Sequence, residues 1–391
     1  MQSKSEILAT KRKIKAIYVV GFLFSLTVAI PAYIGSEFIS LLIGKQSVGI
    51  VFATEAVATI MLLSVFGLIL KKNGNIHASI LALSFGILAV LGIFFLKTPI
   101  LVILSFLLFL IVSNLFYLNL DVLLEKYTTN SSTGSIRGIF MSVSNSAWVI
   151  SPLIAGFIIS ETNHQTVFLV AGLLLLPTIL ILLLNFKDFK DSPYKITPLS
   201  KLITILPKHK DTLKIWMSNF LLYFFYSWMV IYMPIYLHND MGFDWKTIGL
   251  MFTLMLMPFV ILEAPLGKLA DERFGEKEML SAGFIIIGLG TAFLGFIAIP
   301  DFWLFASGLV ITRIGASMIE IMNETYFFKK CDASDSDMVS LFRMTRPIAY
   351  IVGPLAGSFF LLFTNYNYLL FILAGIMFLG LRYSLTIKDT K

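Results

Sequence analysis

The sequence predicts an all-α membrane protein with twelve transmembrane helices, arranged as two six-helix bundles. Three observations predict this fold: an apolar composition, a series of long apolar stretches, and an internal repeat. Of the 391 residues, 58% are hydrophobic and 14% are charged, and the mean hydropathy is +0.88. A soluble protein has about 25% charged residues. Much of the surface of this chain must therefore face lipid.

The apolar stretches each run for about 20 residues, the length that an α-helix needs to cross a bilayer. A transmembrane barrel would instead show segments of about ten residues with alternating hydrophobicity. The first stretch is too long for the core of a signal peptide, and no small-residue cleavage site follows it, so we expect it to be retained. The expected spans are 14–36, 47–70, 76–96, 99–121, 136–160, 165–186, 212–237, 246–269, 277–299, 302–327, 337–362 and 367–387.

The basic residues predict the orientation of these spans. With a cytoplasmic N-terminus, nearly all of the 30 Lys and Arg residues fall in cytoplasmic loops. Only Lys45, Lys97 and Lys246 fall on the other side, while three arginines lie within spans. This asymmetry is the positive-inside pattern. It predicts cytoplasmic termini in the plasma (inner) membrane, and it explains the net charge of +7 without nucleic-acid binding.

The two halves of the chain resemble each other at an offset of about 200 residues, as expected for a duplicated transporter-like bundle. Residues 31–34 match 234–237, and residues 151–155 match 353–357. Further matches in the same order pair 48–52 with 248–252, Gly67 with Gly267, Pro99 with Pro300 and Asp121 with Glu324. We expect an N-terminal bundle at 1–186, a cytoplasmic linker at 187–211 and a C-terminal bundle at 212–391.

The loop after the eighth span carries a family motif. It reads Gly267-Lys-Leu-Ala-Asp271-Glu-Arg273-Phe-Gly275-Glu-Lys. This resembles the Gly-x-Leu-Ala-Asp-Arg-x-Gly-Arg-Lys loop signature of the major facilitator superfamily. The resemblance implies a secondary transporter that works by alternating access. It also implies that Asp271 helps to latch the bundles in the outward-facing state, that Gly267 packs the end of the eighth helix, and that Arg273 and Gly275 shape the turn. Arg137, at the start of the fifth span, is the candidate partner of Asp271.

Charged residues at bilayer depth are costly and suggest function. In the tenth span, Arg313, Glu320 and Glu324 share one helical face, about 17 to 33 Å along the helix from Phe302. Asp121 holds a related position in the fourth span. A partly desolvated carboxyl group could carry a proton between the two sides. Glu320 is the first candidate for proton coupling, followed by Glu324, Asp121 and Arg313. The alternatives are an Arg313–Glu320 or other interhelical ion pair that only holds the bundle, or direct contact with substrate.

Aromatic and amide side chains of the seventh span suggest a binding surface. Asn219, Tyr223 and Tyr226 share one face, and the fourth span carries Asn114 and Tyr117. Aromatic rings with a few polar groups suit an amphipathic organic ligand. The chain contains 36 phenylalanines, so many of its aromatic rings must face lipid. These five residues are the candidates for substrate binding.

The remaining motifs limit the function classes. One cysteine and four scattered histidines give no metal-ligand spacing, no nucleotide-binding loop occurs, and no nucleophile–base pair indicates an enzyme. We expect no cofactor, a small-molecule substrate, protons as a second partner, a lipid bilayer around the chain, and a monomer. Residues 151–156 and 353–357 are similar to the Gly-Pro signature of drug:proton antiporters in the superfamily. That similarity favours an exporter of amphipathic compounds. A proton-coupled importer of a metabolite, or a sensor or scaffold without transport, is the alternative.

Overall fold

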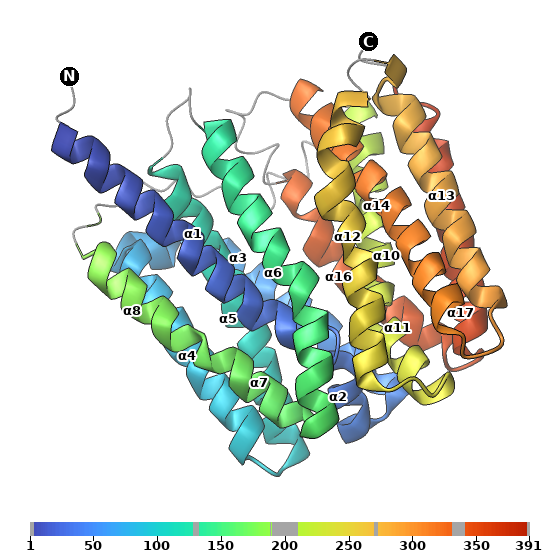
Figure 1. The fold of residues 1–391 in the computed structure, drawn as a ribbon, viewed down its shortest axis with the longest axis horizontal. Coiled ribbons are helices and arrows are strands. Elements are labelled where there is room, and N and C mark those ends of the chain that lie inside the picture. Colours follow the sequence, from blue (N-terminus) through green and yellow to red (C-terminus); the bar gives the residue numbers. More distant parts are fainter. Residues whose placement is uncertain are drawn as a thin grey trace. The chain divides into compact units, whose positions relative to one another are not determined.

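The computed structural model describes residues 4–127, 133–187, 189, 210–269, 273–330 and 341–388, and no β-strand occurs within these ranges (Figure 1). The helices are α1 (Lys4–Ala32), α2 (Gly35–Ile43), the 3₁₀-helix η1 (Lys45–Ser47), α3 (Val48–Asn73), α4 (Asn75–Phe95), α5 (Pro99–Glu125), α6 (Thr133–Glu161), α7 (His164–Leu173), α8 (Leu175–Asn185), α10 (Lys210–Ile231), α11 (Met233–Ile235), the π-helix η3 (Tyr236–Asp240), α12 (Trp245–Leu269), α13 (Glu276–Phe296), α14 (Phe302–Lys330), α16 (Thr345–Phe360) and α17 (Tyr366–Ser384).

Eleven helices of the described residues are long and apolar enough to cross a membrane. The prediction of an all-α membrane fold is therefore confirmed. The difference from the expected twelve spans lies at 337–362. Residues 331–340 fall outside the described ranges, and α16 has 16 residues, fewer than the about 20 that a perpendicular crossing needs. A crossing at this position stays a prediction.

The helices form two compact units. Unit 1 contains Met1–Gly35 and Ala58–Ile196, and unit 2 contains Ser36–Val57 and Thr197–Lys391. Helix α3 therefore begins in unit 2 and ends in unit 1. The halves expected at 1–186 and 212–391 stay a prediction, and most of the expected linker at 187–211 lies outside the described residues.

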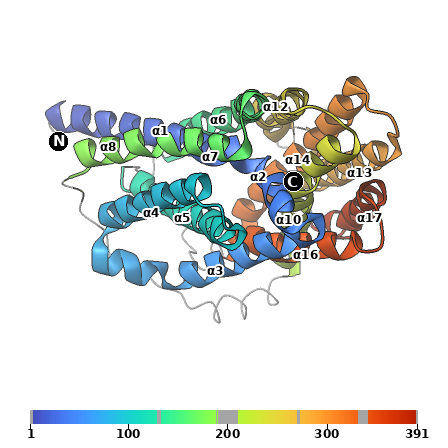
Figure 2. The ribbon, with the colours of Figure 1, turned by 90° about the horizontal axis from the view of Figure 1, so that it is seen from below.

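Several helix pairs recur in the two units. In unit 1, α4 packs against α5 and α7, and α1 packs against α5, α6, α7 and α8. In unit 2, α13 packs against α14 and α17, and α10 packs against α14, α16 and α17. Figure 2 shows α4 beside α5 and α13 beside α14. Because these pairs recur at the offset of the repeat, the duplication seen in the sequence is also a duplication of packing.

The ends of corresponding helices repeat as well. Asn163 caps α7 by accepting a hydrogen bond of 2.9 Å from the Thr166 backbone N–H, and Asn365 caps α17 in the same way. The residues before α4 and α13 are Gly74 and Gly275, whose φ angles are +76° and +84°. Only glycine adopts such angles without strain, so the two turns keep the same residue type.

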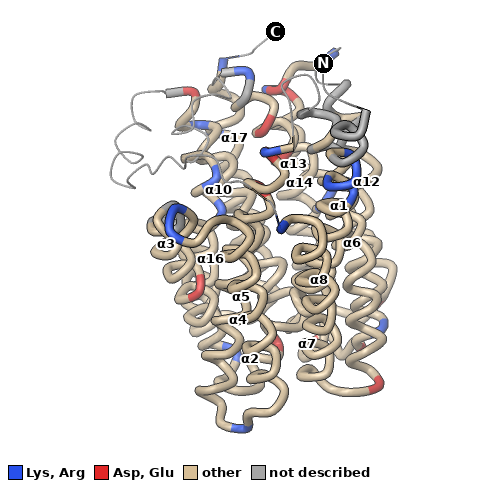
Figure 3. Tube along the Cα trace, turned by 90° about the vertical axis from the view of Figure 1, so that its left-hand side faces the viewer, with Lys and Arg blue, Asp and Glu red and all other residues tan. Residues whose placement is uncertain are grey.

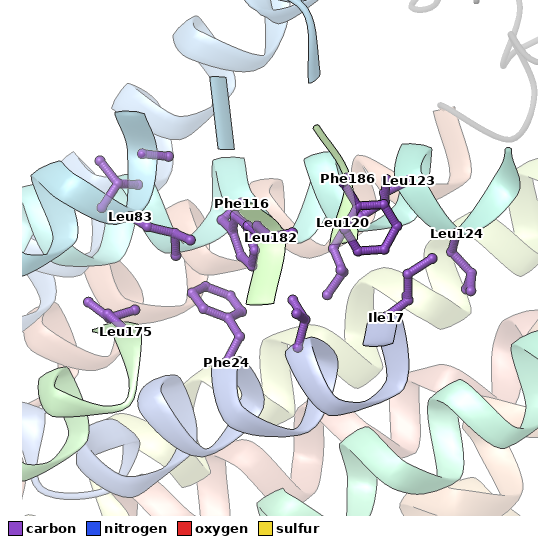
Figure 4. Packing of buried hydrophobic residues seen from close by; sticks show 13 residues of the cluster. Ile17, Phe24, Leu83, Phe116, Leu120, Leu123, Leu124, Leu175, Leu182 and Phe186 are labelled. Carbon is purple, nitrogen blue, oxygen red and sulfur yellow. The ribbon is translucent and has the colours of Figure 1, made fainter. Parts of the chain in front are cut away.

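The core of unit 1 is a cluster of aliphatic and phenylalanine side chains. Leu83 of α4, Leu120 of α5 and Leu182 of α8 meet there with Phe24 of α1 (Figure 4). The Phe24 and Phe116 rings lie edge to face with centroids 4.4 Å apart. Lipid tails are as apolar as these side chains, so helices in a membrane associate through close van der Waals packing of this kind.

Three of the expected spans are interrupted near a proline: between α1 and α2 after Pro31, between α7 and α8 before Pro177, and after α10 before Pro234. Proline has no N–H to donate within a helix, and its ring displaces the preceding turn. The last interruption continues into the π-helix η3, where the Met241 N–H donates to the Tyr236 carbonyl at 3.0 Å.

Charged residues gather near helix ends in each unit (Figure 3).

The N-terminus of α12 gives a prediction about stability. Asp244 accepts hydrogen bonds from the Thr247 backbone N–H at 3.1 Å and from its hydroxyl at 2.6 Å. The hydroxyl hydrogen bond from Thr247 is the main cause that lowers the pKa of Asp244. We expect Asp244→Ala to reduce the free energy of unfolding by about 1 kcal/mol near neutral pH.

The pH dependence of this effect follows from the direction of the pKa shift. Because folding lowers the pKa of Asp244, the stabilisation is complete above the unfolded pKa of about 3.9 and is lost as pH falls through the folded pKa. Melting curves in detergent should therefore separate Asp244→Ala from wild type near neutral pH, and the difference should be smaller at about pH 3. An equal difference at both pH values would contradict this assignment.

Candidate functional site

Two helices of unit 2, α10 and α14, place the strongest group of candidate residues together. Glu320 of α14 accepts a hydrogen bond from the Tyr226 hydroxyl of α10, with 2.7 Å between the hydroxyl oxygen and Oε2. The Tyr223 and Tyr226 rings are one turn apart on α10, and their centroids are 5.8 Å apart. Phe259 of α12 adds a third ring, 6.2 Å from that of Tyr226. The site is thus a carboxyl group enclosed by aromatic rings and held by one hydroxyl donor.

Arg313 lies two helical turns from Glu320 on the same helix. Its residue is 2% exposed, and its guanidinium carbon lies 5.5 Å from the Phe225 ring centroid and 5.2 Å from that of Tyr226. No acidic oxygen of the described residues lies within 4.0 Å of it, so the Arg313–Glu320 ion pair considered from the sequence is not formed there. Its Nε and Nη2 atoms are buried and have no hydrogen-bond partner among the described residues.

Glu324, the second carboxyl group on this face, has a cation as its partner. Arg343 donates from Nη1 to Oε1 at 2.5 Å and from Nη2 to Oε2 at 3.3 Å. The two side chains are 33% and 57% exposed, respectively. Glu320 and Glu324 therefore differ in kind, since the first is held by a neutral hydroxyl and the second is paired with a guanidinium group.

Two amide side chains tie α10 to its neighbours. Asn219 donates from Nδ2 to the Thr345 hydroxyl of α16 at 2.7 Å, and the Ser218 hydroxyl donates to Oδ1 of Asn323 on α14 at 2.7 Å. Asn219 thus uses a side-chain donor within the protein. Thr345 and Ser218 were not candidates from the sequence, because small hydroxyl residues carry no signal until the helices that face them are known.

The remaining substrate and proton candidates lie on α5 in unit 1. Asn114 donates to the Leu110 carbonyl of its own helix at 3.2 Å, and the Tyr117 ring packs edge to face on Phe24 with centroids 4.8 Å apart. Asp121 is exposed. Asn114 and Tyr117 therefore make contacts within unit 1, and Asp121 lies at its surface. Their roles in substrate binding and proton coupling stay predictions.

The expected latch falls partly outside the described residues. Asp271 lies in the undescribed segment 270–272, and the side chain of Arg137 is also undescribed, although its residue belongs to α6. Gly267 lies near the end of α12, and Arg273 is exposed. Gly275 occupies the turn before α13 with φ +84°, as its expected turn role requires. The pairing of Asp271 with Arg137 stays a prediction.

The same turn contains an ion pair that sequence analysis missed. Glu276 stands where the family signature has a basic residue, and it is 1% exposed. Its carboxylate pairs with the Lys329 ammonium group at the end of α14. Since 53 residues separate these positions, no local spacing could have indicated the pair.

An all-helical, multi-pass membrane architecture with a buried polar site is the class that these observations define. The family model of the Major Facilitator Superfamily matches residues 16–249 and 215–389. The chain belongs to the Major Facilitator Superfamily.

A distant relative is similar to this chain in sequence, and two solved structures are similar to it in fold. The relative is the "Probable sulfoacetate transporter SauU" of Cupriavidus necator, 23% identical over 216 residues that cover 50% of this chain and 47% of the relative. The chain thus matches about half the length of that relative. The fold is similar to a POT family transporter in complex with 5-aminolevulinic acid (TM-score 0.78, 14% identity, 97% of each chain) and to the nucleoside transporter NupG (TM-score 0.73, 13% identity, 97% of this chain and 98% of the other).

Proposed function

We propose that this protein couples the movement of a small amphipathic organic solute to protons by alternating access, with Glu320 as the proton-carrying group. The single observation that carries the proposal is the Tyr226–Glu320 hydrogen bond of 2.7 Å within the aromatic group on α10 and α14. A carboxyl group with a neutral hydroxyl partner can exist in both protonation states without breaking an ion pair.

The surroundings of Glu320 support this role. Charged groups at bilayer depth are costly, and among the described residues no cation lies within 4.0 Å of this carboxylate. Protonation removes the cost of the charge, so uptake and release of a proton would change which conformation is favoured. Glu324 is less suited, because protonation there would leave the Arg343 guanidinium group without its partner charge.

The proposal includes the orientation and latch expected from the sequence. Cytoplasmic termini in the inner membrane, a monomer, and an outward-facing state favoured by Asp271 are parts of it. Export in exchange for protons is the direction that the Gly-Pro signature at 353–357 favours. Uptake together with protons is the other direction that the experiment below distinguishes.

Proteoliposomes that contain a pH-sensitive dye test the proposal. Wild type should move protons when members of a panel of amphipathic compounds are added, and the sign of the pH change gives the direction. Glu320→Gln should abolish the solute-dependent proton movement, and Tyr226→Phe should reduce it. Glu278→Gln, which changes an exposed carboxyl group in the first turn of α13, is the matched control.

Two outcomes would count against the proposal. Equal proton movement by wild type and Glu320→Gln would exclude Glu320 as the carrier. Solute movement without any proton movement would exclude proton coupling, and the absence of both would favour the sensor or scaffold alternative.

A further inference from the structure

The guanidinium group of Arg313 is charged, buried and incompletely satisfied. The residue is 2% exposed at the middle of the 29-residue helix α14. Its Nε and Nη2 atoms have no hydrogen-bond partner in the part of the chain that the structure describes. Buried polar groups in proteins are nearly always hydrogen-bonded, and an exception requires an explanation.

The ring contacts of Arg313 supply no acceptor for its Nε–H and Nη2–H groups. The Phe225 and Tyr226 rings lie against the guanidinium group, at 5.5 and 5.2 Å from its carbon. Such cation–π contacts stabilise the positive charge through the face of the plane, but they accept no N–H hydrogen bond in that plane. The nearby carboxyl group of Glu320 is engaged with Tyr226.

The two unpartnered atoms are on the same edge of the guanidinium plane. Nε–H and the adjacent Nη2–H point in parallel, and this edge binds two oxygens of one oxyanion by parallel hydrogen bonds. A purely structural arginine would have this edge filled by a carboxylate or by carbonyl groups of the protein. Two parallel N–H donors without a protein acceptor are therefore the arrangement that binds an external oxyanion.

We propose that Arg313 is the anion-binding part of the transport site, and that the solute is a small organic anion with a carboxylate or sulfonate group. This inference rests on the proposed function, since it assigns the substrate class of the same site. The oxyanion binds to Nε and Nη2 of Arg313, and the apolar part of the solute packs against the aromatic rings of α10. Arg313 thus selects for charge, while Tyr226 and Phe225 select for an apolar body.

Equilibrium binding to the full-length protein in detergent tests the inference. The probes are two matched pairs, phenylacetate with phenylacetamide and benzenesulfonate with benzenesulfonamide, together with inorganic sulfate. At least one organic anion should raise the melting temperature of wild type and bind about tenfold or more tightly than its uncharged counterpart, the scale of a hydrogen bond to a charged group. The phenylacetate and benzenesulfonate arms distinguish carboxylate from sulfonate recognition.

Variants of Arg313 provide the specific readout. Arg313→Lys keeps the charge but lacks the planar edge, and it should weaken anion binding by roughly tenfold. Arg313→Gln should make the anion and its amide bind alike. Arg382→Gln removes an exposed arginine of α17 and should bind like wild type. Circular dichroism and size-exclusion chromatography identify any variant that fails to fold, and in that case Arg313→Lys decides the result.

Several results would overturn the inference. These are equal affinity for anions and amides in wild type, unchanged anion binding in Arg313→Lys and Arg313→Gln, binding of inorganic sulfate only, or no melting-temperature shift with any anion of the panel at millimolar concentration. Failure of the proposed function gives a different result from failure of this inference. Anion binding through Arg313 without proton movement refutes proton coupling alone, whereas proton movement driven by uncharged solutes alone refutes the anion site alone.

Discussion

Replacing Gly357 of α16 by valine should strongly lower the melting temperature of the purified protein. A Cβ atom at Gly357 would lie 2.2 Å from Cε2 of the Tyr232 ring. Tyr232 is held in place, because its hydroxyl donates to the Pro354 carbonyl at 2.5 Å. The ring therefore cannot move aside without losing that hydrogen bond.

The size of the effect follows from the two costs that add. Overpacking a filled interior costs about 1–3 kcal/mol, and loss of a buried hydrogen bond costs about another 1 kcal/mol. A second contact makes relaxation of α16 more difficult, since the Trp228 indole N–H donates to the Gly353 carbonyl at 2.6 Å. A total of roughly 2–4 kcal/mol is a large part of the stability of a domain.

Gly375 of α17 provides the matched control. A Cβ atom there meets no other atom of the described residues within 4 Å, so Gly375→Val makes the same substitution in a helix without the close Cβ contact found at Gly357. Thermal melts monitored by size-exclusion or intrinsic fluorescence compare the two variants. Equal melting temperatures would show that the packing of α16 on α10 does not depend on the small residue at position 357.

The fold could be predicted from the sequence because a lipid bilayer permits few backbone structures. Backbone polar groups within a bilayer must bond to each other, so long apolar stretches become helices. The same argument predicts where helices begin and end within a few residues, as the expected 76–96 and the observed α4 (Asn75–Phe95) show. It does not predict breaks such as that before Pro234, because a proline in a span can also be accommodated by a bend.

The sequence predicted which candidate residues share a face of one helix, but not which side chains of other helices they contact. Helical periodicity placed Arg313 and Glu320 on one face of α14. Which partner each side chain takes depends on the rotation of neighbouring helices, which no spacing within α14 encodes. The expected alternative of an Arg313–Glu320 pair failed for this reason, since α10 presents the Tyr226 hydroxyl to the carboxyl group.

Reversing the charge of Arg343 should slow solute-dependent transport by roughly tenfold. In the wild type, Arg343 donates two hydrogen bonds to Glu324. Arg343→Glu removes them and places a second carboxylate beside Glu324. Two like charges about 4 Å apart repel by about 4 kcal/mol at an effective dielectric constant of 20. The side chains are 33% and 57% exposed, and solvent reduces the net effect to about 1–2 kcal/mol.

The double variant Glu324→Arg/Arg343→Glu distinguishes an ion pair from a proton carrier. If Glu324 serves to pair with Arg343, the exchanged charges attract each other again, and transport by the double variant should recover most of the wild-type rate. If Glu324 itself carries protons, arginine at that position cannot replace it, and the double variant should be as slow as Glu324→Gln. Recovery would leave Glu320, whose neutral partner Tyr226 offers no charge to exchange, as the carboxyl group on this face of α14 that can carry the proton.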